Sequence, residues 1–219
     1  MAPFKILLLV TAALTAAACA GPVRYVRPDR PPDPPAYALS VWIDDHPLLD
    51  LADVVRGCIE WRAKGVICRL AADPASADVR ISVDDKPCVP DAEGLKTLAL
   101  AYHDGRIVFM PKCFDGSTDY VRRLFRAVMT HEVGHEVGIW EHVPLKCDGK
   151  AASHDGRPIC GPAVMNRLAD ADLGFVTVVD SLAFEARAAD DTRLRPLGSP
   201  PRRGPSVKDD RSICVFRSK

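Results

Sequence analysis

The sequence has no excess of charge of either sign. Its 219 residues include 29 Lys and Arg and 29 Asp and Glu, so the formal net charge is zero. Proteins that bind nucleic acid or an anionic membrane surface through their overall charge carry a clear excess of basic residues. The balance therefore gives no reason to expect either partner, and we expect no nucleic acid to bind.

Aromatic residues are also scarce, at 6% of the chain, although hydrophobic residues as a whole make up 47%. A disordered chain is poorer in hydrophobic residues, so the composition indicates a globular domain. The apolar run "ILLLVTAALTAAA" at residues 6–18 is short and rich in Ala, which is typical of an export signal and not of a membrane-spanning helix. We expect residues 1–18 to be a signal peptide.

The end of this run, "ALTAAAC", resembles a bacterial lipoprotein signal. The resemblance implies that Cys19 becomes the lipidated first residue; cleavage after "AAA" or "ACA" is the alternative. The segment "PVRYVRPDRPPDPP" that follows is rich in proline and predicts an extended spacer over residues 19–35. We therefore expect export, either to the outer membrane or cell surface on a lipid anchor that is the only membrane contact, or to the periplasm or medium.

Export changes how the eight cysteines are interpreted, because disulfides form in oxidising compartments. With Cys19 lipidated, seven cysteines remain. Pairing of sequence neighbours predicts three disulfides and leaves Cys214 without a partner: Cys58–Cys68, Cys88–Cys113 and Cys147–Cys160.

A single α+β domain is predicted over residues 36–190. Apolar spacing and turn residues indicate a helix, a half-buried strand, a hairpin that turns at Asp104-Gly105, a second helix and a last helix, at residues 47–65, 77–85, 97–111, 117–138 and 174–187. Thr177 and Asp180 resemble a capping box at the start of the last helix. Residues 191–219 are polar and rich in proline, which predicts a flexible tail.

The stretch "HEVGHEVGIWEH", residues 131–142, carries the chemistry. The apolar stripe of the preceding helix continues from Val128 to His131 and His135, so both imidazoles should project inward. Histidines four residues apart lie on one helix face and can bind one ion, while Glu132 is rotated to the side, where it can take a proton from water. Gly138 permits the chain to leave the helix and turn back.

A turn-forming "CGPAVMN" lies downstream and places Met165 after a Gly-Pro pair. Together with HExxHxxG, it resembles the metzincin clan of zinc metallopeptidases. The resemblance implies a twisted mixed sheet packed on an active-site helix, a Met-turn at Met165 and a C-terminal helix. It implies Zn²⁺ as cofactor, Glu132 as general base, and a protein or peptide as the substrate of an endopeptidase.

The third ligand departs from the metzincin pattern. Strict spacing puts it on Glu141, and His142 follows one residue later. We expect His142, because a loop absorbs one residue and neutral imidazole preserves a site of three histidines. Glu141 stays open as the alternative.

Three other interpretations stay open. The fold can belong to a non-catalytic surface lipoprotein that acts as a binding or assembly factor. A distant Glu185 can complete the metal site of a different zinc-peptidase clan. A separate structural zinc site can form from residues of the loop after the motif, namely His142, Cys147, His154 and Cys160.

Overall fold

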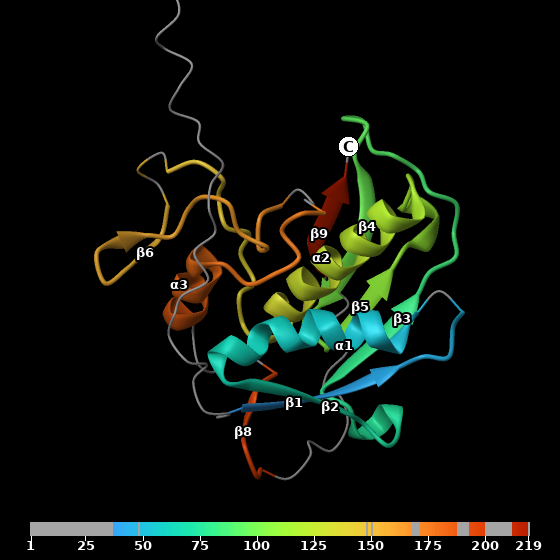
Figure 1. Ribbon diagram of the computed structural model, residues 1–219, viewed down its shortest axis with the longest axis horizontal. Coiled ribbons are helices and arrows are strands. Elements are labelled where there is room, and N and C mark those ends of the chain that lie inside the picture. Colours follow the sequence, from blue (N-terminus) through green and yellow to red (C-terminus); the bar gives the residue numbers. More distant parts are fainter. Residues whose placement is uncertain are drawn as a thin grey trace, which may run out of the picture.

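The structure is a computed structural model that describes residues 37–47, 49–147, 149, 151–167, 171–187 and 193–199, together with the backbone of 212–218. The predicted signal peptide, Cys19 and the spacer lie outside these residues. Within them the chain forms one mixed β-sheet with helices packed against it (Figure 1). The fold class is therefore α+β, as the sequence predicts.

The sheet and its helices follow one another along the chain. The strands are β1 Tyr37–Ile43, β2 Val66–Leu70, β3 Val79–Val83, β4 Lys96–Tyr102, β5 Arg106–Phe109, β6 Ser153–His154, β7 Arg157–Pro158, β8 Arg195–Pro196 and β9 Ser212–Ser218. The helices are α1 Leu51–Ile59, α2 Thr118–Glu136 and α3 Val178–Ala186, with short 3₁₀ segments η1 Glu60–Lys64, η2 Pro74–Ser76 and η3 Pro111–Cys113.

The main sheet has the order β2-β1-β3-β5-β4-β9, and β8 pairs with β1 away from this path. Strands β2, β1, β3 and β5 run parallel, whereas β4 runs antiparallel to β5 and to β9. Helices α1 and α2 cover one face of the sheet (Figure 1). Parallel neighbours need crossover connections, which α1 provides between β1 and β2.

Helix α2 begins where its sequence predicts. Ser117 caps its N-terminus by accepting a hydrogen bond from the amide of Tyr120 at 3.4 Å. The predicted apolar stripe is buried at Leu124 and Val128, which pack into the core beneath the sheet. The last helix, the half-buried strand and the hairpin are also confirmed, and α3 has the predicted capping box between Thr177 and Asp180.

The three predicted disulfides are present. Cys58–Cys68 joins α1 to β2, Cys88–Cys113 joins the β3–β4 connection to η3, and Cys147–Cys160 closes the loop after α2. Three disulfides are typical of a protein outside the cytoplasm. Among the described residues, no helix has the length and apolar character that crossing a bilayer requires.

Two segments beyond residue 190, expected to be a flexible tail, join the sheet. Arg195 of β8 is buried, and its guanidinium donates to the carboxylate of Asp78 at 2.8 to 3.0 Å. β8 pairs antiparallel with β1, and β9 adds a strand to the edge of β4. Folded structure therefore continues past the predicted end of the domain.

Candidate metal centre

The second half of α2 carries polar side chains into the core. From Thr130 onward the helix turns its predicted inward stripe towards the protein interior, and five polar residues have no solvent exposure: Thr130, His131, Glu132, His135 and Glu136. Burial of so many polar groups is costly unless each has a partner or a function. This half of α2 is therefore the candidate site.

His131 and His135 are oriented by backbone carbonyls. Nδ1 of His131 lies 2.7 Å from the carbonyl oxygen of Val164, and Nδ1 of His135 lies 2.6 Å from that of Ile139. A carbonyl oxygen only accepts, so each Nδ1 carries the proton. Each Nε2 then carries a lone pair, and these two atoms face each other at 2.9 Å. Two lone pairs at this distance repel, and a shared cation relieves the repulsion.

His142 joins these two histidines. Gly138 has a left-handed φ of 102°, and the amide of Ile139 donates to Gly134, so the helix ends and the chain turns back. One ligand nitrogen from each of the three histidines can be chosen so that all lie within 4.8 Å of one another. Nε2 of His142 is buried and has no hydrogen-bond partner among the described residues. The structure therefore brings together the three histidines that the sequence predicts as ligands.

The Met165 turn lies directly under α2. Met165 is fully buried, and a Cβ added to Gly134 would lie 2.2 Å from its sulfur and 2.8 Å from Trp61. Only glycine at residue 134 allows the turn to approach this closely. The carbonyl of Met165 accepts from the amide of Val143 at 2.8 Å, which ties the turn to the residue after His142.

Asp180 holds this turn in place from α3. Its carboxylate accepts hydrogen bonds from the amides of Val164 and Met165 at 3.0 Å, and from the amide and hydroxyl of Thr177 at 2.8 Å. Val164 in turn offers its carbonyl to His131. A chain of contacts therefore runs from α3 through the turn to the first histidine, as partners behind a metal ligand do. The sequence shows Asp180 only as a capping residue, since contact with the turn depends on tertiary structure.

The ring of Trp140 was not anticipated as part of the site. It stacks on His135, with ring centroids 5.9 Å apart and planes at 11°, and its ring centroid lies 4.0 Å from that of His103. His103 belongs to the turn between β4 and β5, so this end of β4 adjoins the histidine cluster. No signal in the sequence links residue 103 to residue 140.

The histidines are held neutral. Burial lowers the pKa of His135 to about 3 and that of His142 to about 4, and the pKa of His131 also falls well below its usual range. Desolvation is the largest cause in each case, and repulsion from neighbouring positive groups adds to it, including Arg167 beside His142. Neutral imidazoles are the form that binds metal ions, so the site keeps its ligands ready at neutral pH.

Glu132 is buried next to the first histidine on the helix. Neither carboxyl oxygen has a hydrogen-bond partner among the described residues. Burial, and then the charge of Glu136, raise the pKa of Glu132 well above its usual value. Burial also raises the pKa of Glu136 well above its usual value, although the guanidinium of Arg193, 3.9 Å from its carboxyl group, opposes that rise. A nearby cation favours an ionised carboxylate, so a bound metal ion would offset the rise in the pKa of Glu132.

The alternative ligands lie elsewhere. Glu141 is exposed and is not part of the histidine cluster. Glu185 is exposed and pairs with Lys64 at 2.9 Å. Cys147 and Cys160 form a disulfide with each other, so they offer no thiolates to a structural zinc site with His154.

The donor set fits a zinc ion. Two nitrogens on one tetrahedral zinc lie about 3.4 Å apart, so the 2.9 Å between the facing Nε2 atoms needs to widen by only about half an ångström. His142 supplies a third nitrogen, and a protein with three such ligands leaves a fourth position open, as catalytic zinc sites do.

Comparison with known proteins adds little to this geometry. No protein family and no curated protein sequence matches the chain. Three chains of solved structures match it. One is myroilysin, which is 9% identical with a TM-score of 0.38 over 67% of this chain and 90% of the other. A likeness this weak carries no argument, so the interpretation of the site rests on its own residues.

Proposed function

We propose that the chain is a zinc-dependent endopeptidase of the metzincin type. The observation that carries the proposal is the pair of facing Nε2 atoms with the third nitrogen of His142 beside them, all three unprotonated at neutral pH. Glu132, buried and without a protein partner in the described residues, distinguishes this set from a purely structural zinc site, which needs no base.

His131, His135 and His142 would hold the ion. A zinc ion bound there would act as a Lewis acid towards water and towards the carbonyl of the scissile peptide. Glu132 would accept a proton from water at a carboxylate oxygen and later donate that proton to the amine nitrogen of the leaving peptide. Hydrolysis then balances, since one water and one peptide bond give a carboxylate and a protonated amine, with both protons of the water on the amine nitrogen.

Substrate would approach from the side of His142. This residue is partly exposed, whereas His131, Glu132 and His135 have no exposure. The exposed Glu141 and the half-buried Trp140 flank the same approach. Productive binding therefore requires this side of the loop to move away from the buried residues, since a peptide carbonyl has to reach the neighbourhood of Glu132.

The burial of Glu132 also favours a second candidate function. A carboxyl group with a raised pKa and no access to water suits a binding or assembly factor that keeps the fold without hydrolysis. Metal content does not distinguish the two functions, because a protein of either kind would bind zinc. Peptidase turnover distinguishes them, because only the enzyme cleaves peptides.

The deciding experiment measures zinc and peptidase activity on the same preparations. The exported chain is analysed for metal stoichiometry and assayed on a library of fluorescence-quenched peptides, with and without a chelator and after zinc is restored. We expect one zinc per chain and cleavage that the chelator abolishes. One zinc per chain with no cleavage of any peptide would establish the binding-factor interpretation.

Matched variants assign the roles. Glu132→Gln keeps the size of the side chain and should retain zinc while losing at least ~100-fold in kcat. Glu141→Gln changes an exposed carboxylate of the same loop and should leave both measurements unchanged. Normal cleavage by Glu132→Gln would show that the assignment of the base is wrong, and loss of zinc in Glu141→Gln would return the third-ligand role to Glu141.

A further inference from the structure

Helix α1 carries two apolar stripes instead of one. Val54 and Cys58 are buried against α2 and the sheet. Leu51, Val55 and Ile59 are also four residues apart, but they lie on the outside and expose 48%, 39% and 53% of their surface. A surface helix normally places polar residues at such positions. The outer stripe therefore lies on the surface, outside the buried core.

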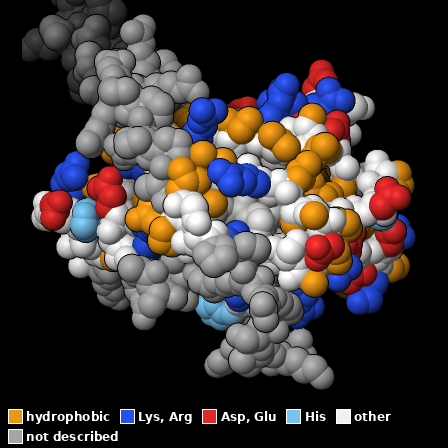
Figure 2. Space-filling view, turned by 90° about the horizontal axis from the view of Figure 1, so that it is seen from below, with side chains coloured by type: hydrophobic (Ala, Val, Ile, Leu, Met, Phe, Trp, Pro, Cys, Tyr) orange, Lys and Arg blue, Asp and Glu red, His pale blue; other side chains and the backbone are white. Residues whose placement is uncertain are grey.

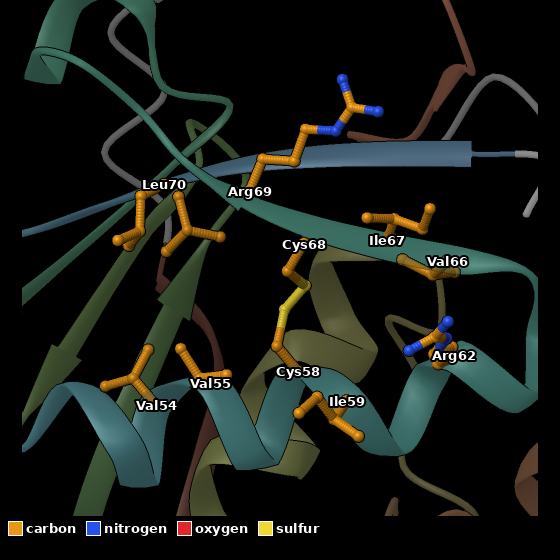
Figure 3. A pocket seen from close by; sticks show the side chains of 11 residues that line it. Val54, Val55, Cys58, Ile59, Arg62, Val66, Ile67, Cys68, Arg69 and Leu70 are labelled. Carbon is orange, nitrogen blue, oxygen red and sulfur yellow. A yellow bond between two sulfur atoms is a disulfide. The ribbon is translucent and has the colours of Figure 1, made fainter.

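A groove runs beside this stripe, between α1 and the edge strand β2 (Figure 3). Its volume is about 230 Å³, and its walls are mostly apolar. Val54, Val55 and Ile59 lie on the helix side, and Leu70, which exposes 59% of its surface, lies on the strand side. The Cys58–Cys68 disulfide links the two walls, so their spacing is fixed covalently. We call the outer stripe, the groove and Leu70 together the α1–β2 face.

Positive charge surrounds the α1–β2 face. Arg62 lies beside the groove, and Arg56 is exposed on α1 next to Val55; Arg69 borders the groove, but its side chain points away from α1 (Figure 3). None of the three guanidinium groups has an ion-pair partner within the described part of the chain. Figure 2, which looks from the side where β1 and β2 lie in Figure 1, shows hydrophobic and basic side chains interleaved near the centre, with acidic ones mainly towards the margins. Unpaired cations around apolar side chains complement an anionic amphiphile.

The chain also enters the domain at this corner. The amide of Tyr37, the first residue of β1, donates to the carbonyl of Gly65 at 3.1 Å, and Tyr37 pairs with Val66 at the start of β2. Residues 20–36 separate Cys19, the predicted lipidation site, from Tyr37. This connection reaches at most roughly 60 Å. A lipid anchor on Cys19 would therefore hold the α1–β2 face at a high effective concentration next to a bilayer.

We propose that the α1–β2 face docks the domain on the surface of a bilayer that contains anionic phospholipid. The outer stripe and Leu70 enter the boundary between head groups and acyl chains, and Arg56 and Arg62 contact lipid phosphates. The zero net charge of the whole chain does not oppose this, because the two basic groups act locally, within a Debye length of the surface. The docking is independent of catalysis and stands or falls separately from the peptidase proposal.

Vesicle partitioning tests the proposal. The chain, as the host exports and processes it, is mixed with vesicles of phosphatidylcholine alone or with about a third phosphatidylglycerol, and the partition coefficients are compared. An acyl anchor acts in both vesicles, so the ratio isolates the contribution of the face. One arginine near an anionic surface contributes about fivefold, so Arg56 and Arg62 together should give a preference of about 25-fold.

Two double variants identify the residues that cause the preference for anionic vesicles. Arg56→Gln with Arg62→Gln should reduce the ratio about 25-fold. Val55→Ser with Ile59→Ser should weaken binding to the anionic vesicles about tenfold, because two inserted side chains are lost. Arg122→Gln and Val89→Ser alter exposed residues on other elements and should leave binding within about twofold. Zinc content and the midpoint of thermal unfolding verify that each variant is folded.

Two outcomes would overturn the proposal. The first is no preference for anionic vesicles, or a preference that both double variants retain. The second is a dimer of the wild type in analytical ultracentrifugation that becomes a monomer in Val55→Ser/Ile59→Ser while vesicle binding is unchanged. That result would assign the face to a second copy of this chain.

Discussion

Helices α1 and α2 depart from the usual pattern in opposite ways. The second half of α2 buries two histidines, two glutamates and a threonine, whereas the outer stripe of α1 exposes three large aliphatic side chains. Both departures have a cost to solubility or folding, and neither helps to form the core. We infer that buried polar groups mark a site of chemistry, whereas exposed apolar groups mark a binding surface.

Removal of a histidine from α2 should have the largest effect. His135→Ala takes away one of the two facing Nε2 atoms, so we expect zinc affinity to fall at least ~100-fold. Metal competition measurements check this, with His154→Ala as a control, because the imidazole of His154 lies outside the cluster, 3.7 Å from Asp155 and 4.0 Å from Glu185. Unchanged affinity in His135→Ala would show that the cluster is not the metal site.

The next largest effect should come from Asp180→Ala, which should destabilise the folded protein. The variant leaves the amides of Val164 and Met165 and the hydroxyl of Thr177 without their buried acceptor. We expect the free energy of unfolding to fall by about 3 kcal/mol. Urea denaturation measures the change, and zinc affinity should fall with it, because the Val164 carbonyl orients His131. A stability loss with full zinc affinity would show that the turn does not position the ligand.

Gly134→Ala tests how tightly the site is packed. The new methyl would lie 2.2 Å from the Met165 sulfur, and we expect a loss of about 2 kcal/mol. Gly174→Ala is the matched control, since its nearest neighbour would be 3.7 Å away, and it should change stability by under about 0.5 kcal/mol. Equal melting temperatures for the two variants would contradict the close approach of the turn.

The free energy of unfolding of the metal-free protein should fall both at low pH and at high pH. Below pH 6.5 the unfolded histidines take up protons that the folded ones refuse until about pH 3 to 4, so stability falls as the pH falls. Above pH 4.5, the glutamates of the unfolded chain lose protons. Glu132 and Glu136, buried in the folded chain, keep theirs, so stability falls as the pH rises.

The two effects oppose each other between pH 4.5 and 6.5, so stability should be highest there. Outside this window it should change by about 1.4 kcal/mol per pH unit for each group that titrates only in the unfolded chain. Denaturation in the presence of a chelator measures the curve. Zinc should move the maximum to higher pH, because it binds neutral imidazoles and favours ionised carboxylates; a curve that is identical with and without zinc would refute the assignment.

The smallest effect on stability should come from the outer stripe of α1. Ile59→Asp replaces a side chain that is 53% exposed, and we expect the free energy of unfolding to change by no more than about 0.5 kcal/mol. Val54→Asp on the inner stripe of the same helix should cost several kcal/mol, since its side chain is buried. A similar loss in both variants would show that the outer stripe also supports the core.

Local patterns in the sequence predict much of the site. The spacing of His131, Glu132 and His135 along an apolar stripe gives the helix and its inward face, and Gly138 gives the turn that returns His142. Local patterns fail where contacts are distant along the chain. The carbonyl of Val164, the clamp by Asp180 and the stacking of Trp140 on His135 all depend on tertiary packing.

The same limit applies to the fold. The hairpin at Asp104-Gly105 is local and was predictable, whereas β1 and β2 pair in parallel across α1 and were not anticipated. The apolar positions of α1 are too numerous for helical spacing alone to decide which stripe faces inward. Burial shows that the stripe of Val54 faces inward and that the stripe of Ile59 faces outward.

The order of strands in the sheet has a consequence for biosynthesis. The first strand, β1, pairs with β8 (Arg195–Pro196), and the sheet is extended at its other side by β9 (Ser212–Ser218). Both contacts form only after these late residues have left the ribosome. The sheet is therefore incomplete until translation has passed residue 218, and an emerging chain has to exist for most of its synthesis without β8 and β9.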